Sequence, residues 1–269
     1  MRNAHIFQYA EAQARIRARI GALPTNTQWR YIADAADLDN LIERMRSYGL
    51  THWVQSLPRH PDAETIERAL YDALLALTET VADFLPAQWN QIREWVRIGS
   101  RLLLVERLLN ESTINLTKNT AHPLRRLAKL PIEDRRAALV GTHYQVYFEN
   151  GIASLDRWLE EFDDRCPKLY KREAYVIRRV VACIRNHHTR IRLFRERVRA
   201  EDRSMDANTE WHLRDALAQR LRDLIGGDPF HAGLVLIYGL LELIQYERCR
   251  ALLIARSRGW SVATVMMSA

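Results

Sequence analysis

An adjacent histidine pair, His187–His188, is the first place where this sequence has residue types that bind metal ions or act as catalytic bases. Successive residues of a helix point about 100° apart, so this pair cannot share a metal-binding face as residues four apart can. His187 also falls on an apolar stripe with Val180, Cys183 and Ile191. That position predicts a core histidine with one hydrogen-bonding partner rather than a ligand.

Sequence motifs of known catalytic chemistry are absent from the chain. It contains no H-E-x-x-H zinc motif, no phosphate-binding P-loop, no G-x-G-x-x-G after a strand and no G-x-S-x-G. The Gly226–Gly227 pair follows a helical pattern and precedes Asp-Pro, which predicts the end of a helix. We therefore expect no catalytic residue, no metal site and no cofactor, in a protein that is not an enzyme.

A basic segment offers the clearest functional surface. Between Lys168 and Arg203 the chain has 12 Lys and Arg against 4 Asp and Glu, a net charge of +8, while the whole chain carries +7. A positive helix face can be a solvated surface, a docking surface for an acidic protein or anionic headgroups, or a nucleic-acid surface. Base-stacking aromatic residues do not alternate with these arginines, which disfavours nucleic acid. We select Arg192, Arg195 and Arg199 as residues that dock a partner or headgroups.

The composition predicts an all-α fold. Gly (10) and Pro (8) are sparse among 269 residues, and Ala, Leu, Arg and Glu, which are good helix formers, dominate. Three cysteines without a C-x-x-C pair indicate a reducing compartment. The first 20 residues lack the apolar stretch of a signal peptide. The longest apolar run, Ala232–Ile244, has 13 residues and contains Glu242, whereas a membrane span needs roughly 20. We expect a soluble chain without a transmembrane segment.

Apolar residues at steps of three and four predict three successive long-helix pairs joined by short helices. One compact body is expected, with loose subdomains over residues 1–112, 113–203 and 204–269. Asp37 is a predicted N-cap, because its side chain can accept a hydrogen bond from a first-turn N–H. The predicted long helices cover residues 3–22, 61–85, 86–109, 142–165, 168–200, 208–225 and 230–258, and the short ones cover 27–33, 37–47, 130–139 and 259–267.

The stretch from Gly233 to Trp260 raises a separate question, because charged residues interrupt a run that begins as apolar as a membrane helix. Its leucines and isoleucines point in several directions around the helix, which is typical of a core helix that is packed on several sides. Glu247 and Arg250 lie three apart, and Glu242 lies four before Tyr246. We expect these polar residues to satisfy one another locally.

Both ends of the chain have a characteristic pattern: Tyr9 followed by "ARIRARIGAL" and then "ADLDNLIERMRSYGL" near the start, and Arg250 to Gly259 near the end. These stretches resemble the family of central-stalk rotor adaptors found in V-type and A-type rotary ATPases. The first stretch is similar to the family's opening helix, and the second is similar to the helix that follows, which ends at a Tyr. Three residues depart from the family pattern, namely Gln13, Gln245 and Arg248. The closing stretch keeps the outline of the family's last helix through Arg250, Leu253, Arg256 and Gly259.

The resemblance implies a funnel of three helical subdomains around a pseudo-threefold axis. It also implies a non-catalytic central-stalk subunit that seats on the cytoplasmic mouth of the membrane ring of proteolipid subunits and receives the tip of the central shaft. Such a protein would couple the shaft to the ring for ion transport, proton transport included, as a peripheral protein at the cytoplasmic face of the membrane. The alternative from the residues themselves is an Arg-rich helical scaffold or nucleic-acid-binding protein.

Overall fold

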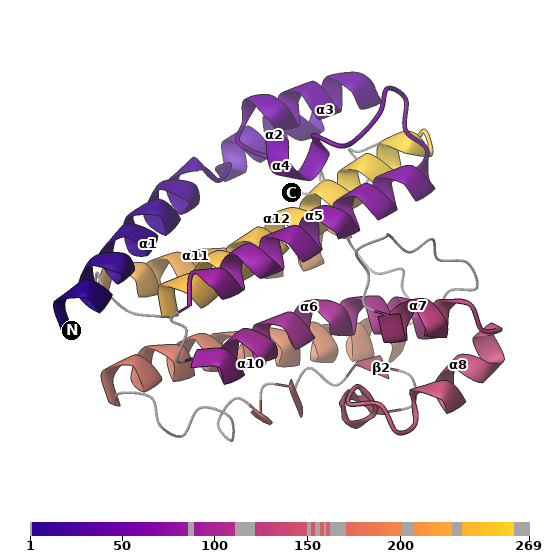
Figure 1. The fold of residues 1–269 in the computed structure, drawn as a ribbon. Helices are drawn as coiled ribbons and strands as arrows, with labels where there is room; N and C mark the ends of the chain where they lie inside the picture. Colours follow the sequence, from indigo (N-terminus) through magenta and orange to yellow (C-terminus); the bar gives the residue numbers. More distant parts are fainter. Residues whose placement is uncertain are drawn as a thin grey trace. The chain divides into compact units, whose positions relative to one another are not determined.

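The computed structural model describes most of the chain, and its described residues are almost entirely helical (Figure 1). They contain eleven α-helices and one antiparallel ladder with two residues in each strand. The all-α prediction is therefore confirmed, whereas a pseudo-threefold arrangement is not shown by the described residues. These residues are 2–85, 89–110, 122–149, 152–153, 157–158, 160–161, 171–200, 207–227 and 233–260.

The chain divides into two compact units, and each is described by itself. Unit 1 comprises residues 1–74 and 170–269, and unit 2 comprises residues 75–169. The boundary between positions 74 and 75 falls inside the long helix α5 (Ala63–Asp83). The predicted subdomain boundaries, after residues 112 and 203, do not coincide with the boundaries of these two units. The division into three subdomains stays a prediction.

Unit 1 is built around its last helix. Helix α12 (Gly233–Ser257) contacts α1, α3, α10 and α11, and 16 of its 25 residues are buried. The prediction of a core helix packed on several sides is confirmed. Besides α12 and the first part of α5, unit 1 contains α1 (Arg2–Ala22), α2 (Asn26–Ala33), α3 (Leu38–Ser47), α4 (Thr51–Val54), α10 (Lys171–Ala200), α11 (Ala207–Asp223) and the 3-10 turn η3 (Leu224–Gly227).

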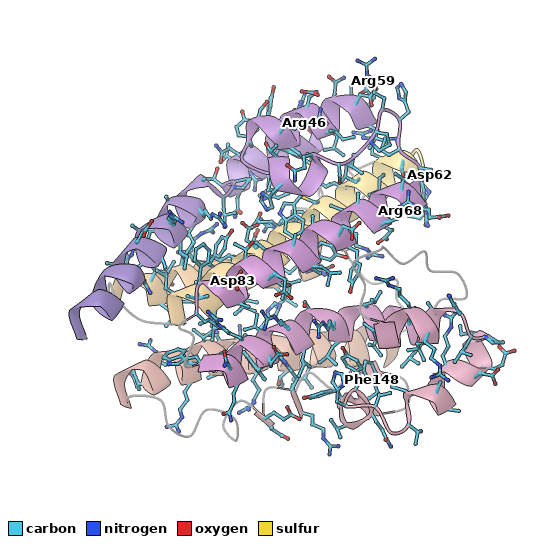
Figure 2. All side chains as sticks on the ribbon, in the orientation of Figure 1. Arg46, Arg59, Asp62, Arg68, Asp83 and Phe148 are labelled. Carbon is cyan, nitrogen blue, oxygen red and sulfur yellow. The ribbon has the colours of Figure 1, made fainter. Side chains whose placement is uncertain are left out.

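Polar caps set the beginnings of three helices in unit 1. Asp37 is the N-cap of α3, where its Oδ1 accepts a hydrogen bond from the Asn40 backbone N–H at 2.8 Å, as predicted. Thr25 and Gln28 form a reciprocal capping box at the start of α2. Asp62, labelled in Figure 2, accepts from the Thr65 backbone N–H at 2.7 Å at the start of α5. Each cap satisfies a donor that the helix itself leaves unpaired.

In unit 2, a buried arginine joins three helices. Arg135 donates to the carbonyl oxygens of Leu108 at 2.7 Å and Ala128 at 3.3 Å, which lie at the ends of two other helices. These carbonyls have no partner within their own helices, so the guanidinium serves as a shared C-terminal cap. The described elements of unit 2, after the end of α5, are α6 (Asn90–Asn110), α7 (His122–Ala128), α8 (Ile132–Leu139), the 3-10 turn η2 (Gln145–Tyr147), β1 (Phe148–Glu149) and β2 (Ile152–Ala153).

Two tryptophans form the centre of the unit 2 core. The rings of Trp95 and Trp158 are stacked, with centroids 4.0 Å apart and an interplanar angle of 1°. Each indole N–H donates to the other residue's carbonyl oxygen, at 2.7 Å from Trp95 and 3.0 Å from Trp158. Gly99 leaves room for this pair, since a Cβ at that position would lie 2.9 Å from Trp158 Cε2.

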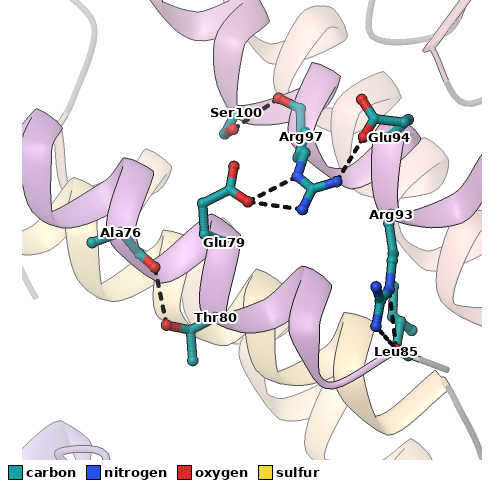
Figure 3. Close-up of polar contacts among 8 residues, drawn as sticks. All are labelled: Ala76, Glu79, Thr80, Leu85, Arg93, Glu94, Arg97 and Ser100. Atoms are coloured by element: carbon teal, nitrogen blue, oxygen red, sulfur yellow. Dashed lines mark hydrogen bonds and ion pairs between the residues drawn. The ribbon is translucent and has the colours of Figure 1, made fainter. Parts of the chain in front are cut away.

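An ion-pair cluster links the end of α5 to α6 within unit 2 (Figure 3). Arg97 Nη2 lies 2.9 Å from Glu79 Oε2, and Arg97 Nη1 lies 2.6 Å from Glu94 Oε1. Arg93 Nε donates to the Leu85 carbonyl oxygen at 3.1 Å, close to the C-terminal end of α5. These contacts join two helices whose connection is short in sequence.

The long helix predicted over residues 142–165 is wrong for residues 142–149 and 152–153, whereas the described residues 157–158 and 160–161 are helical. The first two of these ranges contain η2 and the β1–β2 ladder, in which Phe148 is paired with Ala153 and Glu149 with Ile152. Between the strands stands Asn150–Gly151, a dipeptide that favours a two-residue hairpin turn. Gly141, with a φ of 83°, ends the preceding helical segment in a left-handed conformation. The described residues of this range therefore do not form one continuous helix, and α10 packs on α11 and α12.

The remaining helices agree with the predictions within a few residues, and two were not predicted. Helix α4 is one turn long, and α7 follows the polar connection around residue 115. The closing helix predicted over residues 259–267 lies outside the described residues beyond Trp260, and so do Pro86 and Cys166.

Candidate functional site

The predicted docking residues lie on the last turns of α10. Helix α10 includes the backbone of Arg192, Arg195 and Arg199, but their side chains lie outside what the structure describes. Their role in docking stays a prediction.

A different set of arginines is exposed on α10. Among the α10 side chains that the structure describes, the exposed ones recur at steps of three and four residues, as expected for one face of a helix. The Arg179 guanidinium lies 5.7 Å from the centre of the Tyr175 ring, and Tyr175 and Leu193 are 61 % and 54 % exposed. The sequence has no Asp or Glu between Glu173 and Glu196. We call this surface the α10 arginine face, and define it by Tyr175, Arg178, Arg179, Arg185, Arg190 and Leu193.

Helix α12 carries a buried polar row, Glu242, Gln245 and Arg248, with one residue every three positions. The three side chains are 2 %, 0 % and 2 % exposed. Glu242 Oε2 accepts from the Trp53 indole N–H at 3.2 Å and lies 3.1 Å from His52 Nε2. The partners come from α4, nearly two hundred residues away in the chain. A buried carboxylate requires such partners, because burial without them would be costly.

Gln245 and Arg248 continue the row toward other helices. The Trp29 indole N–H of α2 donates to Gln245 Oε1 at 2.8 Å. Arg248 forms an ion pair with Asp215 of α11, and its guanidinium carbon lies 4.6 Å from the centre of the Trp211 ring and 5.5 Å from that of Trp29. Burial lowers the pKa of Arg248 to about 10, with repulsion from Arg214 as a further cause, so Arg248 stays charged at neutral pH.

The outer polar residues of α12 also pair with other helices. Arg250 Nη2 lies 2.7 Å from Glu67 Oε1 of α5, and Glu247 Oε2 lies 3.8 Å from Arg214 Nη2 of α11. Although burial opposes the charge of Arg250, its hydrogen bonds with Glu67 raise the pKa of this guanidinium overall. The expectation that Glu247 and Arg250 satisfy each other locally was wrong. A partner on a neighbouring helix is available because α12 is surrounded by other helices.

Two further groups of α12 are held in their neutral forms. Burial raises the pKa of the Tyr238 phenol, and the nearby Glu242 carboxylate adds to the shift. Arg19 of α1 donates a hydrogen bond to Tyr238 Oη at 3.3 Å. Burial also raises the pKa of the Cys249 thiol well above its ordinary value. A neutral, fully buried thiol is a poor nucleophile, so Cys249 is a packing residue.

The structure leaves His187 at the edge of the core rather than within it. His187 is half-buried on α10 and lines a pocket with Cys183 and residues of α11. Within the described ranges no three His, Cys, Asp or Glu residues are grouped as a metal site would need. No helix in the described part of the chain has the length and apolar character to cross a membrane.

The sequence contained partial signals for these surfaces. The charge count located the basic segment, but its arginines point in two directions around the helix, so the exposed sector could not be chosen from periodicity. For the buried polar row, the signal was polar residues at every third position of an apolar helix. Two of the three, Gln245 and Arg248, are also departures from the resembled family pattern, and so is Gln13, which is 2 % exposed.

No protein-family model, curated protein or solved structure matches the chain.

Proposed function

We propose that this chain is a non-catalytic central-stalk subunit of a V-type or A-type rotary ATPase. In this proposal it connects the central shaft to the membrane ring of proteolipid subunits and carries torque for ion transport. The funnel of three subdomains belongs to the same proposal. The observation that carries it is that the three stretches resembling the family pack together in unit 1, although they lie at opposite ends of the sequence: α12 contacts both α1 and α3.

The contacts of α12 suit a part that transmits torque. Ion pairs and hydrogen bonds tie α12 to α2, α4, α5 and α11 at successive turns. Because buried and partly buried polar contacts fix the position of one helix against another, they resist sliding and rotation of α12 within the unit. A helical body with such links transmits force without any catalytic group.

The α10 arginine face supplies a charge-complementary surface for attachment. Arginine forks bind carboxylates and phosphates in a bidentate manner, and the sequence of α10 between Glu173 and Glu196 adds no acid to oppose their positive potential. Acidic loops of a partner or anionic headgroups at a membrane surface would be recognised by it. Arg192, Arg195 and Arg199 extend the same basic helix toward its C-terminal end.

The test is co-elution in size exclusion with detergent-solubilised proteolipid ring and shaft subunits from the same source. We expect a stable complex with one copy of this chain per ring. Elution of the chain alone at modest salt would contradict the proposal. If it then bound an oligonucleotide with a steep salt dependence, the scaffold or nucleic-acid alternative would replace it.

Charge variants locate the attachment surface in the same assay. Changing Arg192, Arg195 and Arg199 together to Gln should weaken ring attachment in low salt, and so should Arg179→Gln with Arg185→Gln. The matched control is Arg30→Gln with Arg59→Gln, because both arginines are exposed elsewhere in unit 1. Equal retention of all three variants would mean that the basic helix is only a solvated face.

A further inference from the structure

A pocket between α10 and α11 collects cationic and nucleophilic side chains, of which Arg190 alone also belongs to the α10 arginine face. Helix α10 contributes Cys183, His187 and Arg190, and Arg220 comes from α11. The cavity itself has a volume of about 10 Å³, room for one water, and it opens into about 260 Å³ of space that includes solvent, so a larger ligand would lie at its mouth. Positions 183, 187 and 190 lie on one helix face, because they are separated by four and three residues. The buried side chain of Leu217 provides an apolar wall.

The two arginines have no counter-charge among the described residues. Neither Arg190 nor Arg220 makes a hydrogen bond or ion pair there, and both are exposed. The described acids of the packed helices are engaged elsewhere: Asp215 with Arg248, Asp223 with Gln219, and Glu247 with Arg214. A pocket with two guanidinium groups and an imidazole, and with no described carboxylate on its walls, favours the entry of an anion.

We propose that this pocket binds a small oxyanion of the phosphate class. A guanidinium presents paired N–H donors that match two oxygens of a phosphate, and two such groups can bind three or four of them. The His187 imidazole and the Cys183 thiol lie in the same lining. The apolar wall lowers the local dielectric constant, which strengthens the attraction between guanidinium and phosphate.

The ligand chemistry is a phosphate or phosphomonoester, either free in solution or carried on a membrane surface. Nothing in this inference requires the rotor-adaptor proposal, because it rests on the lining residues alone. The test therefore uses the isolated full-length chain and no ring or shaft protein, so that failure of one proposal does not decide the other.

Cys183 is a built-in reporter of occupancy. In the Cys166→Ser chain, the described thiols are Cys183, which is partly exposed, and Cys249, which is fully buried. The alkylation rate of Cys183 by iodoacetamide is followed by mass spectrometry, with inorganic phosphate or with chloride at the same ionic strength. Phosphate at ten times its dissociation constant should slow alkylation about tenfold, because only the empty pocket exposes the thiol.

Arginine variants show whether protection comes from this pocket. In the double variant Arg190→Gln with Arg220→Gln, phosphate should no longer slow alkylation. The matched control is Arg179→Gln with Arg185→Gln, since these arginines are exposed on α10 but do not line the pocket. Broadening of the phosphorus NMR signal of phosphate by the protein is a second readout that does not depend on the thiol, and it should be lost in the same double variant.

The possible outcomes distinguish free phosphate from a membrane headgroup as the ligand, and one of them overturns the inference. Protection by free phosphate supports a soluble anion. Protection only by phosphatidylcholine vesicles containing phosphatidic acid, and not by phosphatidylcholine alone, supports a headgroup. The inference is overturned if neither slows alkylation more than the chloride control, or if the double variant keeps the protection and the NMR broadening of the unchanged chain.

Discussion

At the scale of single residues, Arg248 is the most unusual side chain of unit 1. It is a charged group with 2 % exposure, and it lies against the rings of Trp29 and Trp211, which meet edge to face at 6.2 Å. The cost of removing a guanidinium from water is offset by the Asp215 carboxylate and by the negative faces of the two rings. A network of this kind specifies which helices meet, because each partner comes from a different one.

Loss of the Arg248 side chain should therefore be costly. We expect Arg248→Ala to lower the free energy of unfolding by about 3–5 kcal/mol, the usual cost of breaking a buried ion pair and leaving a void. Arg248→Met should cost less, because Met fills part of the space and solvent can reach Asp215, which is 22 % exposed. Urea titration followed by far-UV circular dichroism measures both.

The matched control for Arg248 is an exposed arginine of the same unit. Arg185→Ala should change the free energy of unfolding by no more than about 0.5 kcal/mol. An Arg248→Ala chain as stable as the control would show that the network does not hold unit 1 together.

Replacing glycine by alanine should change the stability of the protein in opposite directions at two positions. Gly99→Ala places a Cβ against the stacked Trp158 ring and should destabilise the protein by about 1–3 kcal/mol, as overpacking does. Gly21→Ala, in α1, meets nothing within 4 Å and should stabilise it by about 0.5–1 kcal/mol, since Ala loses less backbone entropy in a helix. Thermal melts of both variants test the signs, and an increase in Tm for Gly99→Ala would refute the packing of this tryptophan pair.

At the scale of elements, local patterns predicted the helices well and the hairpin not at all. Periodic apolar residues and the Asp37 cap depend on neighbours within a few positions, so α1, α3, α5 and α12 were predictable from the sequence. Residues 148–149 and 152–153 pair as strands where a helix was predicted, because an apolar, aromatic-rich stretch suits a helix or a strand, and Asn150–Gly151 favours a hairpin turn.

The partners of polar side chains could not be predicted at this scale. Glu242 and Gln245 bind the indoles of Trp53 and Trp29, and no local spacing links residues so distant in the sequence. The exposed sector of the basic segment could not be predicted for a related reason. The rotation of α10 about its own axis is set by α11 and α12, so the sequence located the basic segment without showing which of its arginines are exposed.

The Asp37 cap of α3 makes stability depend on pH. A hydrogen bond from the Asn40 backbone N–H is the main cause that lowers the pKa of Asp37 below its ordinary value of 3.8. The carboxylate thus contributes stability that is present above the unfolded-state pKa and is lost as the pH falls through the lower folded-state pKa. Asn also caps helices but does not titrate.

We therefore expect the stability difference between the unchanged chain and Asp37→Asn to shrink as the pH falls below 3.8. Urea titrations at a series of pH values measure this difference. Asp37→Ala serves as the control that removes the cap at every pH. A difference that stays constant through the acid range would mean that the carboxylate charge does not contribute to capping.

At the scale of the whole molecule, the chain forms unit 1 from two distant segments and inserts unit 2 between them. The contacts of α12 with α1 and α3 join the two segments of unit 1. These contacts could not be predicted from the sequence, because they link residues from opposite ends of the chain. We therefore expect each unit to unfold cooperatively with its own free energy of unfolding. The reason is that cooperative opening follows a contiguous packed core rather than the order of the sequence.

Hydrogen exchange of the two core variants tests this division. We expect Arg248→Ala to speed amide exchange in α1, α11 and α12 by on the order of 100-fold, as a loss of about 3 kcal/mol implies for amides that exchange through opening of the whole unit. Exchange in α6 and α8 should stay the same, because these helices belong to unit 2. Gly99→Ala should give the reverse pattern. Faster exchange in all five helices for both variants would instead show that the two units unfold together, and torque would then pass through a single cooperative body.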